Sequence, residues 1–193
     1  MKADQQTDNQ RIRLSKRLLQ EALLRLLQKG ELESISVQKL CQEAQINRST
    51  FYRYYGSTRD VLDEMKADFF QKMETGILVG EYDSLLSLEK TLTCLLDNRE
   101  LVSALQRTYS ESSMIEELLK KQPVMEQLQR NARSGFSDED AGYAMDFAVY
   151  GSWAVIRRWL LTGNRAALPH IAALLLEINR QYQQPRQQSG CLS

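Results

Sequence analysis

Apolar residues recur every three or four positions along most of the chain, the spacing that places them on one face of an α-helix. The first such stripe lies between residues 9 and 29, and Gly30 follows it as a signal for the end of a helix. No segment shows the strict alternation of apolar and polar residues that is typical of a half-buried strand. The pattern therefore predicts an all-α fold.

Two short helices are predicted after this stripe. Ser36 is placed to cap the first of them, and its inward face is formed by Val37, Leu40, Cys41 and Ala44. A tight turn at residues 45–46 leads to Asn47, a suitable N-cap for a second helix over residues 48–55. Two helices of about eight residues joined by so short a turn match a helix-turn-helix.

A long helix should begin just after this motif. Gly56 ends the second short helix, and Ser57 with Asp60 forms a capping pattern at the start of the next one. Pro123 should kink or split a later helix. The remaining apolar stripes predict helices near residues 84–96, 98–109, 112–133, 138–162 and 165–183.

These elements predict a domain boundary after Gly56. A small basic helical domain would be followed by a larger acidic helical one, and the polar C-terminal segment should be a flexible tail. The expected ranges are 1–56, 57–184 and 185–193.

Composition supports a globular helical chain with a basic end. Of 193 residues 42% are hydrophobic and 26% are charged, a balance that argues against disorder. Residues 1–60 hold eleven Lys or Arg and seven Asp or Glu, a net charge of +4, while residues 61–193 carry 14 and 18, a net charge of −4. This distribution allows a polyanionic partner at the N-terminal end only, and four charges by themselves do not establish one.

Other function classes find little support. No apolar run approaches the roughly 18 residues of a membrane span, and the N-terminus lacks a signal-peptide core, so a cytoplasmic protein is expected. Cys41, Cys94 and Cys191 are widely spaced, and His170 is the single histidine, so the cysteines should be reduced and no metal site is expected. We expect no cofactor and no enzymatic activity, since no nucleophile or phosphate-loop motif is present.

The segment INRSTFYRYYGSTRD, residues 46–60, concentrates aromatic rings and arginines. The first turn of its helix carries Arg48, Ser49 and Thr50, where side chains can reach base edges in the major groove. Phe51 and Tyr55 are spaced to face inward. The flanks of this helix would then carry Tyr52, Arg53 and Tyr54, whose side chains would contact DNA phosphates. Alternatively, the aromatics are only core and rim.

The run SVQKLCQEAQINRSTFYRYYGSTRDVL resembles the DNA-binding segment of the TetR family of bacterial transcriptional regulators. The resemblance covers residues 11 to about 65. It implies an all-helical homodimer with three N-terminal helices for DNA and a C-terminal bundle for a small ligand. It further implies base contacts from Gln38, Arg48, Ser49 and Thr50, and phosphate contacts from Ser36, Tyr52, Arg53, Tyr54 and Thr58.

Two positions depart from the family pattern. Gln45 stands where the family usually has glycine, and a left-handed conformation there would cost on the order of 1 kcal/mol. Thr58 stands where the family often has lysine, so this phosphate contact would be weaker and Arg59 would replace it.

Two strongly apolar helices near the C-terminus are predicted to form the dimer interface that the resemblance implies. An internal core pair explains the same stripe equally well. The adjacent Arg157 and Arg158 are interpreted as part of a solvent-exposed helix face rather than as an anion-binding site. The predicted interface residues are Phe147, Gly151, Ala154, Val155 and Trp159.

An effector pocket is predicted among the middle helices, lined by soft or aromatic residues that are also compatible with plain core. These residues are Met73, Cys94, Tyr109, Met114 and Phe147. The leading hypothesis is a ligand-responsive transcriptional regulator, expected to be a repressor, that binds a palindromic double-stranded DNA operator as a homodimer. The alternative is a module whose helix-turn-helix binds and regulates another protein. No residue pattern defines the operator, the effector, the regulated genes or the sign of regulation.

Overall fold

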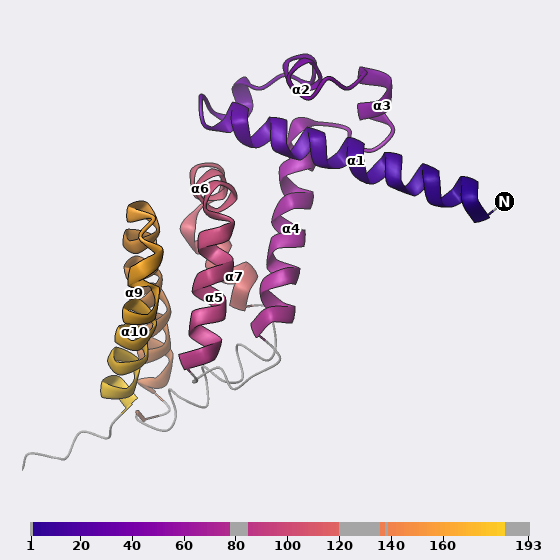
Figure 1. The fold of residues 1–193 in the computed structure, drawn as a ribbon. Helices are drawn as coiled ribbons and strands as arrows, with labels where there is room; N and C mark the ends of the chain where they lie inside the picture. The colour runs from indigo at the N-terminus through magenta and orange to yellow at the C-terminus, as the bar shows by residue number, and fades with distance from the viewer. Residues whose placement is uncertain (1, 78–84, 120–135, 138, 184–193) are drawn as a thin grey trace, which may run out of the picture. The chain divides into compact units, whose positions relative to one another are not determined.

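The computed structural model describes residues 2–77, 85–119, 136–137 and 139–183, and these residues are helical with no strand among them (Figure 1). The all-α prediction is confirmed. The chain packs as two compact units, which we call the head (Met1–Gln71 with Glu100–Ser110) and the body (Lys72–Arg99 with Glu111–Ser193). None of the described helices is long and apolar enough to cross a membrane.

The head is built on one long helix, α1 (Lys2–Leu27), which extends further toward the N-terminus than predicted. It is followed by a short 3₁₀ turn, η1 (Leu32–Ser34), and by α2 (Val37–Ala44) and α3 (Arg48–Tyr52). Part of α4 (Thr58–Ile77) and most of α6 (Arg99–Thr108) complete the unit.

Apolar faces from these helices meet in one core. Fully buried side chains come from α1, α2, α3 and α4, among them Leu19, Leu23, Leu40, Phe51 and Leu62. Burying a side chain of this size stabilises the fold by about 1.5–3 kcal/mol each. This core fixes the short helices α2 and α3 on a rigid support.

Local capping sets where the short helices begin and end. The Ser36 hydroxyl accepts a hydrogen bond of 3.2 Å from the Lys39 backbone N–H, as predicted. Gln45 has a φ of 56°, so the turn after α2 does adopt the left-handed conformation. Helix α3 ends at Tyr52, earlier than predicted, although the N–H of Tyr55 still donates to the Phe51 carbonyl at 3.0 Å.

The capping pattern before α4 is present. The Asp60 carboxylate accepts from the backbone N–H of Gly56 at 2.8 Å and of Ser57 at 3.1 Å, and the Ser57 hydroxyl accepts from the Asp60 N–H at 3.3 Å. These bonds satisfy N–H groups that have no partner within the helix.

The body contains α5 (Leu85–Asp97), α7 (Glu111–Leu119), α9 (Ala141–Thr162), the 3₁₀ turn η2 (Arg165–Ala167) and α10 (Leu168–Gln183). Helices α5, α9 and α10 pack against one another (Figure 1). Their core includes Leu92, Leu95, Trp159, Ala172 and Leu175.

The predicted kink at Pro123 and the predicted tail over residues 185–193 lie outside the described residues. Packing groups α6 and the first part of α4 with the head. The predicted domain boundaries, after residues 56 and 184, stay predictions.

Candidate nucleic-acid interface

The first turn of α3 presents polar side chains to solvent. Arg48 and Ser49 are exposed and Thr50 is half-buried, while Gln38 on α2 is exposed as well. The residues predicted to read bases therefore lie on two adjacent helices that contact each other. A helix whose N-terminal residues are free in this way can insert them into a major groove.

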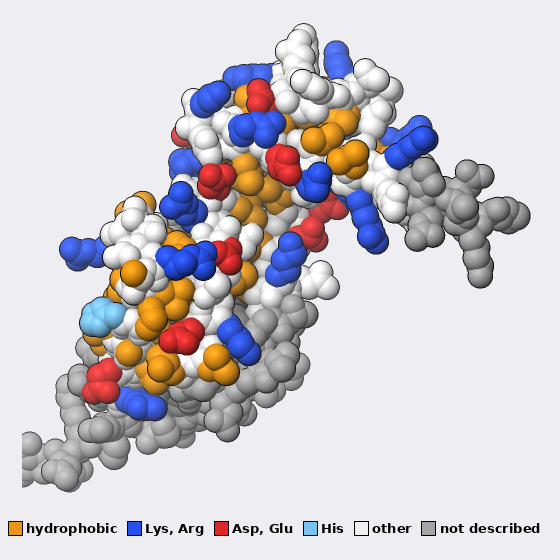
Figure 2. Space-filling view, in the orientation of Figure 1, with side chains coloured by type: hydrophobic (Ala, Val, Ile, Leu, Met, Phe, Trp, Pro, Cys, Tyr) orange, Lys and Arg blue, Asp and Glu red, His pale blue; other side chains and the backbone are white. Residues whose placement is uncertain are grey.

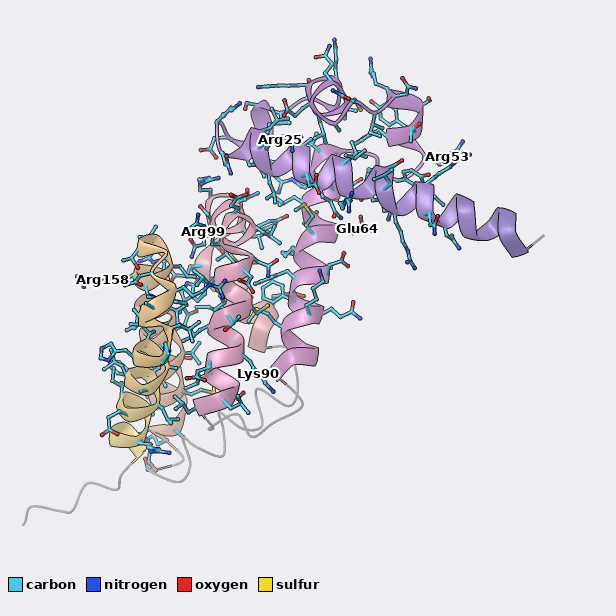
Figure 3. All side chains as sticks on the ribbon, in the orientation of Figure 1. Arg25, Arg53, Glu64, Lys90, Arg99 and Arg158 are labelled. Carbon is cyan, nitrogen blue, oxygen red and sulfur yellow. The ribbon has the colours of Figure 1, made fainter. Side chains whose placement is uncertain are left out.

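The aromatic residues after this turn divide as predicted between core and surface. Phe51 is fully buried and Tyr55 is buried, and their ring centroids lie 5.8 Å apart. Tyr52 is 52% exposed and packs edge-on against Phe51 with centroids 5.4 Å apart. Arg53 is exposed at the end of α3 (Figure 3), and Tyr54 is half-buried. The buried rings anchor α3 to the core, and the exposed Tyr52 and Arg53 side chains remain on its surface.

A hydrogen-bonded network anchors the segment after α3. The Tyr55 hydroxyl donates to Oε2 of Glu64 in α4, and Lys16 of α1 donates to Oε1 of the same carboxylate at 2.6 Å. The Lys16 ammonium also lies 5.4 Å from the centroid of the Tyr55 ring. This network ties α1, the end of the α3 segment and α4 together, and nothing in the local sequence pattern pointed to it.

The network shifts the ionisation of its members. Burial raises the pKa of the Tyr55 hydroxyl, and the hydrogen bond to Glu64 raises it further. Burial pushes the pKa of the Glu64 carboxyl up, but the hydrogen bonds from Lys16 and Tyr55 outweigh it and hold the pKa below its usual value of 4.5. At neutral pH the carboxylate is therefore charged and the phenol neutral.

The predicted phosphate-contacting residues surround the two helices. Ser36 is exposed and already serves as a cap, and Thr58 is half-buried at the start of α4. Arg59, the expected substitute for a lysine, donates to Glu33 of η1 at 2.7 Å. A phosphate would have to compete with that carboxylate, so Arg59 is a weaker substitute than the sequence suggested.

Positive charge is spread over the head. Lysine and arginine side chains lie along several of its helices in Figure 2, with fewer acidic ones among them.

Burial raises the pKa of the Cys41 thiol, against the opposing effect of the nearby Arg48 guanidinium. Cys41 is thus a neutral core thiol, and both it and Cys94 are free.

The predicted pocket residues are divided between the two units. Met73 and Met114 are buried and Cys94 is half-buried in the body, whereas Tyr109 belongs to the head and donates its hydroxyl to Asp63. Phe147 is 56% exposed on α9. Their role as pocket lining stays a prediction.

Helix α9 carries an exposed apolar stripe, which continues on α10. Trp159 is only 4% exposed, and its indole N–H donates to the Asn164 carbonyl at 2.9 Å, so this predicted interface residue is used inside the body instead. Val155 and Gly151 are half-buried. The exposed stripe consists of Tyr143, Phe147, Tyr150, Ala154 and Leu161 on α9, with Ala173 and Leu174 on α10. Tyr143, Tyr150 and Leu161 are seven and eleven residues apart, which places them on one face of a helix, and this was the signal that the sequence interpretation missed.

The two short helices α2 and α3, packed on buried aromatic rings, have the arrangement of a helix-turn-helix. Residues 19–65 match the family described as bacterial regulatory proteins, tetR family. The helix-turn-helix segment of this chain is therefore similar to the DNA-binding segment of TetR-family regulators, as the resemblance implied. No curated protein matches the chain.

Solved structures share the whole fold. A TetR transcriptional regulator from Streptococcus agalactiae 2603V is 19% identical with a TM-score of 0.67, over 90% of this chain and 98% of that one. The dihydroxyacetone kinase operon activator DhaS is 19% identical with a TM-score of 0.56, over 86% of this chain and 94% of that one.

Proposed function

We propose that the chain is a cytoplasmic, ligand-responsive repressor that binds a palindromic operator as a homodimer. The observation that carries the proposal is the first turn of α3. Arg48 and Ser49 are exposed there while Phe51, one turn on, is fully buried. An arginine in this position can pair bidentately with guanine and discriminate against a wrong base by about 1–3 kcal/mol.

Dimerisation would come from the exposed stripe on α9 and α10. A soluble helix rarely leaves Tyr143, Phe147 and Leu161 exposed on one side unless something covers them. Each head would contact few phosphates. A second head would double their number, and with it the electrostatic part of the binding free energy. The operator would then have two half-sites about 34–36 Å apart, or a multiple of that spacing.

The response to a ligand would pass through α4. This helix is continuous across the point where the first segment of the head ends, at Gln71, and the first segment of the body begins, at Lys72. An effector bound among the body helices would shift α4 and so change the separation of the two heads. The proposed sign is repression, and the similarity in fold to an operon activator makes the sign a matter for a transcription assay.

The test is selection of bound duplexes from genomic and random DNA, followed by binding and in vitro transcription with the selected sequence. We expect a near-palindrome, a steep loss of affinity as salt rises, and lower transcription when the protein is added. Candidate small molecules that release the DNA would identify the effector class.

The alternative, a protein-interaction module, makes a different prediction. Under that account no duplex would be enriched, and any weak DNA binding would lack sequence preference. Enrichment of one palindrome whose binding is lost in Arg48→Ala would exclude it.

A further inference from the structure

The N-terminal half of α1 extends beyond the core of the head. Among the α1 side chains whose burial the structure describes, which begin at residue 9, Leu19 is the first buried one. Leu14 is 49% exposed in this stretch. Half-buried side chains such as Lys16 hold this stretch against the head, while its exposed side chains are open to contact with another surface.

Residues 9–18 of α1 form a basic stretch, which Asp4 and Asp8 precede. Residues 9–18 contain four Lys or Arg and no Asp or Glu. Lys16 is engaged with Glu64, and Arg17 lies 3.5 Å from Glu21. The remaining two cations, Arg11 and Arg13, are both exposed. A partner for this surface should carry negative charge.

Helical geometry separates Arg11 and Arg13 onto opposite sides of α1. Successive residues are rotated by about 100°, so Arg11 and Arg13 point about 200° apart. Arg11 lies 14 residues before Arg25, which places the two within about 40° of each other. Arg25 donates to Glu43 of α2 at 2.8 Å, so this side of the helix faces α2. Arg13 lies about 60° from Lys16, on the side that faces Glu64 of α4.

The α2 side is also the side of the recognition helix. Figure 1 shows α2 and α3 on one side of α1 and α4 leaving from the other. Lys16 contacts the ring of Tyr55 just after α3, and Arg11 lies five residues earlier, about 7.5 Å further along the axis. Arg11 thus lies on the α2 side of α1, more than one helical turn beyond the level at which α1 contacts Tyr55.

We propose that Arg11 of each protomer contacts a DNA phosphate just outside the half-site read by α3. The proposal rests on the DNA-binding function proposed above. The contact would carry no base preference of its own, and it would lengthen the footprint of the protein beyond the base pairs that α3 reads.

The test compares Arg11→Gln with Arg13→Gln, which removes the same charge two residues away. Binding to the selected operator is measured over a range of salt, with duplexes that either keep or lack the base pairs flanking the half-sites. Each lost phosphate contact lowers the slope of log affinity against log salt by about 0.9, so the Arg11→Gln dimer should lose about 1.8. Arg13→Gln should keep nearly the full slope. Removing the flanks should weaken the wild type and Arg13→Gln, and leave Arg11→Gln unchanged.

Equal loss of slope in the two variants would overturn the proposal in favour of the general field of the head. Unchanged binding by Arg11→Gln, with normal binding by the wild type, would overturn it while the proposed function stands. Wild-type protein that binds no duplex would end both proposals. If instead Arg11→Gln lost binding to phosphatidylserine vesicles and kept wild-type DNA binding, the surface would be a membrane contact, with Leu14 as its apolar part.

Discussion

The hydroxyl of Tyr109, directly after α6, donates a hydrogen bond to Oδ1 of Asp63 in α4. The Lys66 ammonium lies 4.4 Å from the centroid of the same ring. Two residues earlier, Arg107 donates to the Leu27 carbonyl at the end of α1, at 2.8 Å. These contacts bond α6 to both long helices of the head, so any displacement of α6 must either carry α4 with it or break them.

Tyr109→Phe should lower the free energy of unfolding by about 1 kcal/mol at neutral pH, the usual net value of one hydrogen bond. Burial first, and then the bond to Asp63, raise the pKa of Tyr109 to about 12. A raised pKa means that this contribution is complete below the unfolded pKa near 10 and is lost as pH rises toward 12. Denaturant titrations at pH 7 and above pH 10 should show a smaller alkaline loss in the variant. The exposed Tyr52→Phe, as control, should keep the wild-type loss.

Glu64→Gln should destabilise the head by about 1–3 kcal/mol, because Tyr55 and Lys16 both lose their charged partner. The pKa of Glu64 is lowered, so its contribution is present above about pH 4.5 and is lost as pH falls through the lower folded value. Urea unfolding from pH 6 to pH 3 should therefore show a shallower acid dependence in Glu64→Gln than in the wild type. Glu21→Gln removes an exposed pair with Arg17, so it should change little. An equal effect of the two substitutions would contradict the assigned network.

Gln45→Gly should stabilise the protein by about 1 kcal/mol, since glycine adopts a positive φ without a Cβ clash. Gln42→Gly, three residues earlier inside α2, should instead destabilise it by about 1 kcal/mol. Thermal unfolding of these two variants checks whether each substitution raises or lowers the stability. Destabilisation by both substitutions would mean that the Gln45 side chain makes a compensating contribution.

If the protein forms the proposed dimer through α9, Gly151→Leu should convert it to monomer without unfolding it. A Cβ at Gly151 meets nothing within 4 Å, so the protomer itself can accept a side chain there. Sedimentation velocity should show the monomer, and the melting temperature at low protein concentration should be little changed. A dimer that persists in the variant would place the interface away from this part of α9.

Local signals predicted the DNA-binding segment well. The caps at Ser36 and Asp60 depend on residues within four positions, and the spacing of Phe51 and Tyr55 depends on one helical turn. Such features need no knowledge of the rest of the fold, which is why they were accessible from the sequence.

Contacts between distant residues were not accessible in the same way. Lys16 and Glu64 are 48 residues apart, and no periodicity relates them. The length of α3 was overestimated because its last turn continues with bent backbone after Tyr52. Trp159 was assigned to the interface because its apolar character is equally suited to a core, and only tertiary packing decides between the two.

The most direct test of DNA reading by α3 is competition binding of Arg48→Ala and Tyr52→Phe against an operator library at two salt concentrations. Arg48 is exposed in the first turn of α3, so its loss should relax preference at one position of each half-site by about 1–3 kcal/mol. Tyr52 offers one neutral hydroxyl from an exposed flank, so its loss should weaken every sequence alike by about 1 kcal/mol per half-site and hardly change the salt slope. Altered base preference in Tyr52→Phe together with unaltered preference in Arg48→Ala would contradict this orientation of α3 in the groove.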